Sequence, residues 1–93
     1  MKSTEIKSLI SETFDIAKRD IRIIQDHGWI HIYIRESLKD GYGFKDFREE
    51  RDFLRKVESL VIQNADVYTY VADDGYGTDR NCILSEFNGF EYL

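Results

Sequence analysis

The sequence predicts an α+β fold, a two-layer sandwich in the order α-β-β-α-β-β, with two helices on one face of a mainly antiparallel four-stranded sheet. Two observations carry this prediction: apolar residues recur at helical spacing in some stretches and alternate with polar residues in others. A third is that the tetrapeptide Asp-Gly-Tyr-Gly occurs twice, at residues 40–43 and 74–77, each time after a predicted strand. At 93 residues the chain fits a single domain, residues 1–93.

The first half of the chain is predicted to form a helix and a β-hairpin. Apolar residues at the spacing of one helical face predict a helix over about residues 4–18. Residues 20–25 are rich in β-branched side chains and residues 29–35 alternate, so we expect two antiparallel strands joined by a turn at residues 26–28. The isoleucines of the second strand point one way, and its other face carries Trp29, His31, Tyr33 and Arg35.

The second half is predicted to form one longer helix and two further strands. Residues 44–63 carry an apolar stripe and a charged opposite face, which predicts a helix with one side in solvent. Residues 66–71 alternate, residues 73–80 are predicted to form a loop, and residues 81–87 are predicted to form a fourth strand. An Asn-Gly pair follows, which favours a tight turn and a short fifth strand at residues 90–93.

The repeated tetrapeptide indicates turn chemistry rather than an internal duplication. The first copy lies between a predicted strand and a predicted helix, whereas the second copy lies between two predicted strands. A duplication would have placed both copies in equivalent positions. The letters are therefore interpreted as turn residues that recur in two different settings.

Charge is distributed unevenly along the chain. The net charge is −5, and residues 1–63 hold 12 basic against 12 acidic side chains, so that the excess falls on residues 64–93. An acidic surface repels phosphate backbones and attracts basic surfaces or cations. The alternative is that these carboxylates only keep a sheet edge from aggregating. The acidic residues of this last third are Asp66, Asp73, Asp74, Asp79, Glu86 and Glu91.

Aromatic side chains are predicted to gather on the face of the sheet that the helices leave open. These residues are Trp29, His31, Tyr33, Tyr68 and Tyr70. Three interpretations are open: the face packs against a second copy, it stacks unpaired nucleic-acid bases, or the chain covers it with its own end. The residues available for such a cover are Phe87, Phe90 and Tyr92.

No motif points to catalysis, to a cofactor or to a metal. The acidic loop at residues 73–79 lacks the glycine and glutamate positions of a calcium loop. His27 and His31 fall in a predicted turn and strand, and Cys82 is a lone cysteine, which fits a reducing compartment. No apolar run approaches the roughly 20 residues that span a bilayer. We therefore expect a cytoplasmic protein that is not an enzyme.

Three functions are compatible with these features. The leading hypothesis is a small acidic protein-binding module, an inhibitor of the immunity-protein, antitoxin or phage-encoded type, which presents the acidic residues and Tyr76 to a basic groove of a nucleic-acid enzyme. The alternative is a homodimeric structural or accessory module that uses the aromatic face. The third is a weak binder of single-stranded nucleic acid, which the net charge disfavours.

Overall fold

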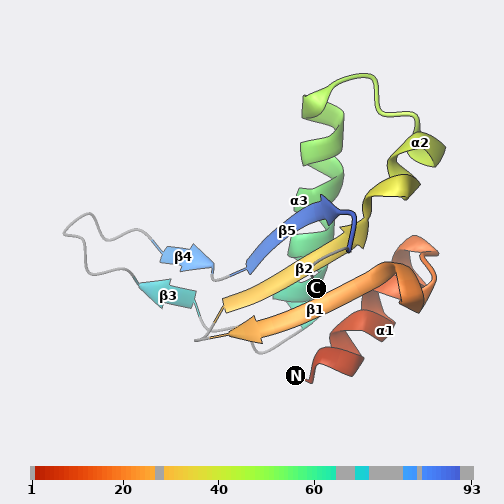
Figure 1. The fold of residues 1–93 in the computed structure, drawn as a ribbon. Helices are drawn as coiled ribbons and strands as arrows, with labels where there is room; N and C mark the ends of the chain where they lie inside the picture. Colours follow the sequence, from red (N-terminus) through yellow and green to blue (C-terminus); the bar gives the residue numbers. More distant parts are fainter. Residues whose placement is uncertain (1, 27–28, 65–68, 72–78, 82, 91–93) are drawn as a thin grey trace.

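The computed structural model describes residues 2–26, 29–64, 69–71, 79–81 and 83–90 (Figure 1). Two short 3-10 helices, Lys18–Asp20 and Glu36–Leu38, accompany the regular elements. The helices and strands are α1 (Ser3–Phe14), β1 (Ile21–Asp26), β2 (Trp29–Arg35), α2 (Lys39–Tyr42), α3 (Phe47–Asn64), β3 (Thr69–Val71), β4 (Asp79–Asn81) and β5 (Ile83–Asn88).

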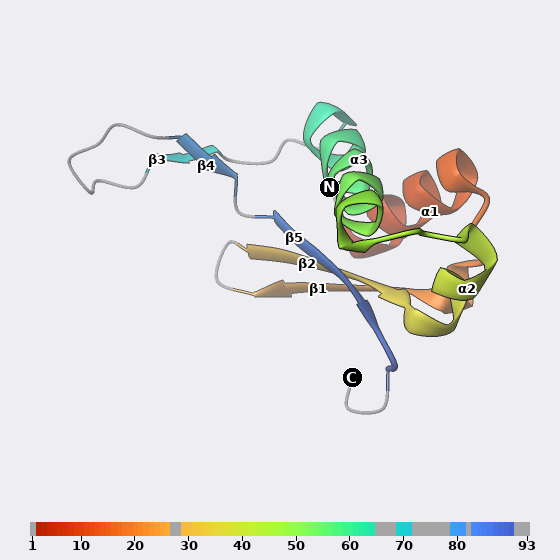
Figure 2. The same ribbon diagram turned by 90° about the horizontal axis from the view of Figure 1, so that it is seen from above.

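A three-stranded sheet forms the centre of the fold, in the order β1-β2-β5. β1 pairs with β2 in antiparallel register, as the predicted hairpin requires, whereas β5 pairs with β2 in parallel. α1 and α3 lie on the same face of this sheet (Figure 2). The α+β class is therefore confirmed.

The prediction of a four-stranded, mainly antiparallel sheet with two helices is wrong. The described residues contain a mixed three-stranded sheet and three α-helices, and β3 and β4 form a separate two-stranded hairpin that projects beyond the sheet in Figure 1. The predicted strand at 81–87 is divided between β4 and β5. The crossover explains the parallel pairing, because the chain leaves β2 at one end and returns through α3 to the end where β2 begins. Residues 91–93 of the predicted fifth strand lie outside the described residues.

Local hydrogen bonds decide where the long helices begin and end. α1 stops at Phe14, earlier than predicted, because Asp15 adopts the left-handed conformation with φ 56°. The Ser11 hydroxyl then donates to the Ile16 carbonyl over 2.6 Å and fixes the turn that follows. α3 begins at Phe47 because the Asp46 carboxylate accepts a hydrogen bond from the Glu49 amide at 3.0 Å.

The hydrophobic core fills the space between the helices and the inner face of the sheet. It draws on α1, α3 and all three strands, so each layer is held by contact with the other. The Ser85 hydroxyl adds a hydrogen bond of 3.3 Å to the Leu54 carbonyl, which ties β5 to α3. The fully or almost fully buried side chains are Ile6, Ile10, Ile16, Ile21, Ile32, Ile34, Val57, Val61 and Ile83.

An aromatic cluster attaches the α2 segment to the end of the core. Tyr42 lies 4.7 Å from Phe53 between ring centroids, and Phe44 lies 5.7 Å from Phe53 and 5.9 Å from Phe87. Gly43, between the first two rings, has φ 64° and ψ 37° and ends α2 in the left-handed conformation. The first Asp-Gly-Tyr-Gly copy is thus a helix end whose tyrosine packs on the core, while the second lies outside the described residues.

Substituting the two glycines of this copy is expected to change stability in opposite directions. A Cβ atom added at either Gly41 or Gly43 meets nothing within 4 Å, so only backbone conformation distinguishes them. Gly43→Ala should lower the free energy of unfolding by about 1 kcal/mol, because alanine is strained at positive φ. Gly41→Ala should be neutral or stabilising by about 0.5 kcal/mol, because it sits within helix α2. Urea denaturation of both variants checks this, and equal effects would contradict it.

Truncating the central strand is expected to cost much more. Ile32 is fully buried in the middle of β2, so Ile32→Ala leaves a cavity and should lower the free energy of unfolding by about 2–5 kcal/mol. Lys56→Ala, on the exposed side of α3, is the control and should stay within about 0.5 kcal/mol of the unaltered chain. Chemical denaturation followed by far-UV circular dichroism measures both, and a loss below about 1 kcal/mol at Ile32 would argue against this core.

Candidate functional site

The strongest candidate site is the face of the sheet opposite the helices. α1 and α3 both pack on the inner face, and among the described residues no helix covers the outer one (Figure 2). Along the middle of that outer face, β2 presents an aromatic row. The row consists of Trp29, His31 and Tyr33, with the His31 ring stacked between the other two rings. Its centroid lies 6.4 Å from that of Trp29 and 6.2 Å from that of Tyr33.

The neighbouring strands extend this row on both sides. In the sheet register, Ile24 of β1 and Leu84 of β5 lie on either side of His31. Arg22 of β1 and Glu86 of β5 lie on either side of Tyr33. Leu84 is 51% exposed and Trp29 is 39% exposed, so the row and its β5 neighbour both present apolar surface to solvent. We call this surface the open face, and it comprises Arg22, Ile24, Trp29, His31, Tyr33, Leu84 and Glu86.

Phe90, two residues after β5, lies at one end of the open face, with the centre of its ring 5.6 Å from the Arg22 guanidinium. Phe90 is held there by a hydrogen bond of 2.8 Å from its amide to the Asn88 side-chain oxygen. The Arg35 guanidinium lies 4.6 Å from the centre of the Phe90 ring, at cation–π distance, and also donates to the Asp20 carboxylate over 2.7 Å. Of the residues considered as a cover, Phe87 instead packs inside, and Tyr92 lies outside the described residues.

The structure describes three of the other predicted site residues, Tyr70, Asp79 and Glu86. Asp79 and Tyr70 belong to the β3–β4 hairpin, which does not join the central sheet. Glu86 lies on the open face, in β5 of the central sheet. The remaining members of the acidic set and of the aromatic set lie outside the described residues, and they are Asp66, Tyr68, Asp73, Asp74, Tyr76 and Glu91. The carboxylate track proposed from the sequence therefore stays a prediction.

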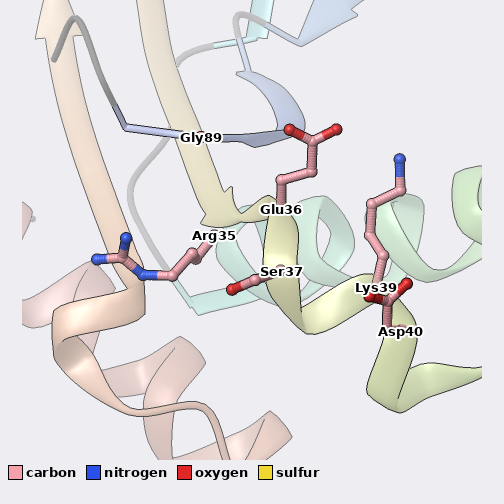
Figure 3. Close-up of a pocket in the computed structure, with 6 residues that line it drawn as sticks. All are labelled: Arg35, Glu36, Ser37, Lys39, Asp40 and Gly89. Carbon is pink, nitrogen blue, oxygen red and sulfur yellow. The ribbon is translucent and has the colours of Figure 1, made fainter.

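A polar cavity of about 550 Å³ lies where β2 leads into α2 (Figure 3). Its two cations are already engaged, since Arg35 binds Asp20, and Lys39 binds Glu50 over 2.7 Å. In Figure 3 the Arg35 guanidinium points away from the side chains of the other labelled residues of the cavity. The hydrogen bond to Glu50 raises the pKa of Lys39, so its amine stays protonated and is unsuited to act as a base.

A second hollow, of about 510 Å³, runs between α3 and the edge of β5. Burial in this groove raises the pKa of the Glu58 carboxyl, although a hydrogen bond from Ser85 and the charges of Arg55 and Arg51 oppose the shift. Sequence reasoning missed the groove, because it depends on which strand lies at the sheet edge beside α3. Its lining mixes charges of both signs with Phe47 and Leu84 and contains no assembled catalytic group.

The described residues provide no metal centre and no membrane-spanning helix. Among them, no three histidine, cysteine or acidic side chains come together in a way that would hold a metal ion. No described helix is long and apolar enough to cross a bilayer.

Removing the charge of Glu58 is expected to alter the pH dependence of stability. The pKa of Glu58 is raised above its ordinary value in the folded chain, so the folded state binds the proton more tightly than the unfolded state. The free energy of unfolding therefore falls as the pH rises and Glu58 loses its proton. Glu58→Gln should therefore gain stability relative to the unaltered chain between about pH 4 and pH 7. Urea denaturation across this range checks the sign, and a difference that stays constant or falls with pH would contradict it.

Comparison with known proteins adds no relative. No protein-family model matches the chain, and no curated protein or solved structure shows significant similarity to it. The function must accordingly be argued from the surfaces described above.

Proposed function

We propose that this chain is a protein-docking module that binds its partner through the open face. The observation that carries the proposal is the stacked row of Trp29, His31 and Tyr33 at the centre of a sheet face that no described helix covers. Burying such aromatic side chains against a partner contributes more to binding than most other contacts.

The arrangement of the row favours binding at low entropic cost. Each of the three rings is anchored on the central strand of the sheet and is stacked on a neighbouring ring. Side chains that are ordered before binding lose less freedom when a partner covers them. The exposed Leu84 beside the row extends the apolar area that a partner would remove from water.

The charges near the row favour a protein partner over nucleic acid. Binding of single strands requires a cationic groove along the backbone as well as stacking rings. Here Arg35 is paired with Asp20, and the Arg22 guanidinium lies 5.6 Å from the centre of the Phe90 ring. The net charge of −5 adds a repulsive field. A base-stacking role therefore lacks its electrostatic component.

This proposal differs from the acidic inhibitor hypothesis in the surface it uses. Both describe protein binding, but the inhibitor hypothesis requires a track of carboxylates. Within the described residues, Glu86 is the member of the acidic set that lies beside the aromatic row. The proposal thus depends on apolar contact, with charge at the rim.

Affinity capture from the cells that produce the chain tests the proposal. Trp29→Ala should weaken partner binding by about 2 kcal/mol, roughly thirty-fold, because it removes the largest ring of the aromatic row. Phe47→Ala is the matched control, since Phe47 is 72% exposed but lies on α3, in the groove beside β5 and not in the aromatic row of β2. The control should recover the same partner as the unaltered chain.

Two results would contradict this function. Equal recovery of the partner by Trp29→Ala and the unaltered chain would show that the open face is not the docking surface. A gel shift of single-stranded RNA or DNA at low salt, abolished by Trp29→Ala, would replace protein docking by nucleic-acid binding. Loss of binding in Phe47→Ala alone would move the docking site to the groove beside α3.

A further inference from the structure

We infer that the edge of β5 that faces away from β2 binds an extended segment of another protein, which joins the sheet as an additional strand and lies in the groove beside α3. We call this site the β5 edge. The segment is defined by its chemistry: the side that faces α3 is apolar and carries a carboxylate. The inference goes beyond the docking role of the open face, because it depends on backbone hydrogen bonds at a sheet edge rather than on rings of a sheet face.

The backbone of β5 is available for a further strand. β5 is an edge strand of the central sheet, in the order β1-β2-β5 (Figure 1). In the part of the chain that the structure describes, β2 is the one strand that pairs with β5, and the register is unbroken over all six residues. An edge strand presents unpaired amides and carbonyls, and proteins usually protect them with proline, lysine or a bulge. The β5 segment contains neither proline nor lysine, so its edge is suited to strand addition.

One stripe of α3 runs along the β5 edge and forms the wall of the groove. Its members recur three or four positions apart, which is the spacing of one helical face. The stripe spans residues 47–58, or roughly 16–17 Å along the helix axis. An extended segment of five residues covers the same length at about 3.3 Å per residue. The residues of the stripe are Phe47, Glu50, Arg51, Leu54, Arg55 and Glu58.

An added strand would direct every second side chain toward α3. In β5 the corresponding position is that of Ser85, whose hydroxyl donates to the Leu54 carbonyl over 3.3 Å, whereas Leu84 and Glu86 belong to the open face. Leu54 and Phe87 line the groove and are only partly buried by the chain itself. Apolar side chains of the added strand that pack on these two residues would remove further apolar surface from water.

The charges of the wall favour a segment with a carboxylate. Glu50 is already paired with Lys39 over 2.7 Å. Arg51 and Arg55 are exposed and lie one helical turn apart, and neither makes an ion pair with a carboxylate of the described residues. Burial raises the pKa of the Glu58 carboxyl, and both arginines are among the groups that oppose this rise, so Glu58 offsets one of the two cations. The remaining positive charge is complementary to an acidic side chain of the added strand.

The described part of this chain offers no strand of its own for the β5 edge. β3 and β4 pair with each other and not with β5. After β5, Phe90 places its ring centre 5.6 Å from the guanidinium of Arg22, which belongs to β1 on the other side of β2. The last described residues thus lead toward β1 and away from the groove, so the strand that fits the β5 edge comes from another protein.

Peptide selection followed by amide hydrogen exchange tests the inference. Seven-residue peptides displayed on phage are selected on the full chain, and the enriched peptides should alternate apolar residues with others and contain aspartate or glutamate. In the complex with a selected peptide, the β5 amides that exchange fast in the free chain should exchange at least about ten-fold more slowly. The amides of β1 should exchange at unchanged rates.

Methylation of the peptide backbone tests strand addition directly. N-methyl groups on every second residue remove the donors of one edge of the peptide, and N-methyl groups on the intervening residues remove those of the other edge. One of the two methylated peptides should bind at least about ten-fold more weakly than the unmodified peptide, because it loses its hydrogen bonds to β5. The other should bind within about three-fold of the unmodified peptide. Equal binding by both would contradict strand addition.

Charge reversal on α3 tests the wall of the groove. Arg51→Glu/Arg55→Glu should weaken binding of the selected peptide at least about ten-fold, because carboxylates then face its acidic side chain. Arg51→Gln/Arg55→Gln, which removes the two charges without reversing them, should weaken it less. The matched control is Arg48→Glu/Lys56→Glu, which makes the same change of charge at exposed positions of α3 that do not line the groove. Circular dichroism of each variant confirms that it folds.

Failure of this inference can be distinguished from failure of the docking role. Selection that enriches no peptide would overturn strand addition, as would protection of β1 amides in place of β5 amides or equal binding by the arginine variants and their control. Trp29→Ala should bind the selected peptide within about three-fold of the unaltered chain, because the β5 edge does not include the aromatic row. Loss of the peptide in Trp29→Ala but not in Arg51→Glu/Arg55→Glu would place it on the open face, which would overturn this inference and support the docking role.

Discussion

The structure depends on the pairing of β2 with a strand on each side. Its even-numbered isoleucines enter the core between the sheet and the helices, while its odd-numbered positions carry the aromatic row to the outer face. Because successive side chains of a strand point to opposite faces, the core and the exposed aromatic row draw on alternate residues of one segment. A shift of register by one residue would exchange the two sets and destroy both.

The sequence predicted local structure better than strand partners. Alternation at 29–35 predicts the two faces of β2, and helical spacing predicts α1 and α3. Both patterns depend only on residues close together in the sequence. The partner of a strand is instead set by how the chain returns to the sheet. Nothing in the alternation at 81–87 shows that β5 lies parallel to β2, or that β4 belongs to a hairpin.

The same distinction applies to the candidate site. The members of the aromatic set on β2 come together because one strand carries them, whereas Tyr70 lies in the separate β3–β4 sheet. Ile24 and Leu84 join the candidate site through the register, which places both of them beside His31 although they are far apart in the chain. The groove beside Glu58 depends on an edge that no local pattern reveals.

The parallel pairing of β5 also has a kinetic consequence. Residues paired between β1 and β2 are 3 to 13 positions apart, from Asp26 with Trp29 to Ile21 with Ile34, whereas Ile30 pairs with Ile83, 53 positions later. Closing the loop of 53 residues costs about 1 kcal/mol more in chain entropy than closing the loop of 13. We therefore expect β5 to join the sheet after the β1–β2 hairpin has formed. Leu84 and Glu86 would then complete the open face last, and a ligand bound across all three strands would slow the release of β5.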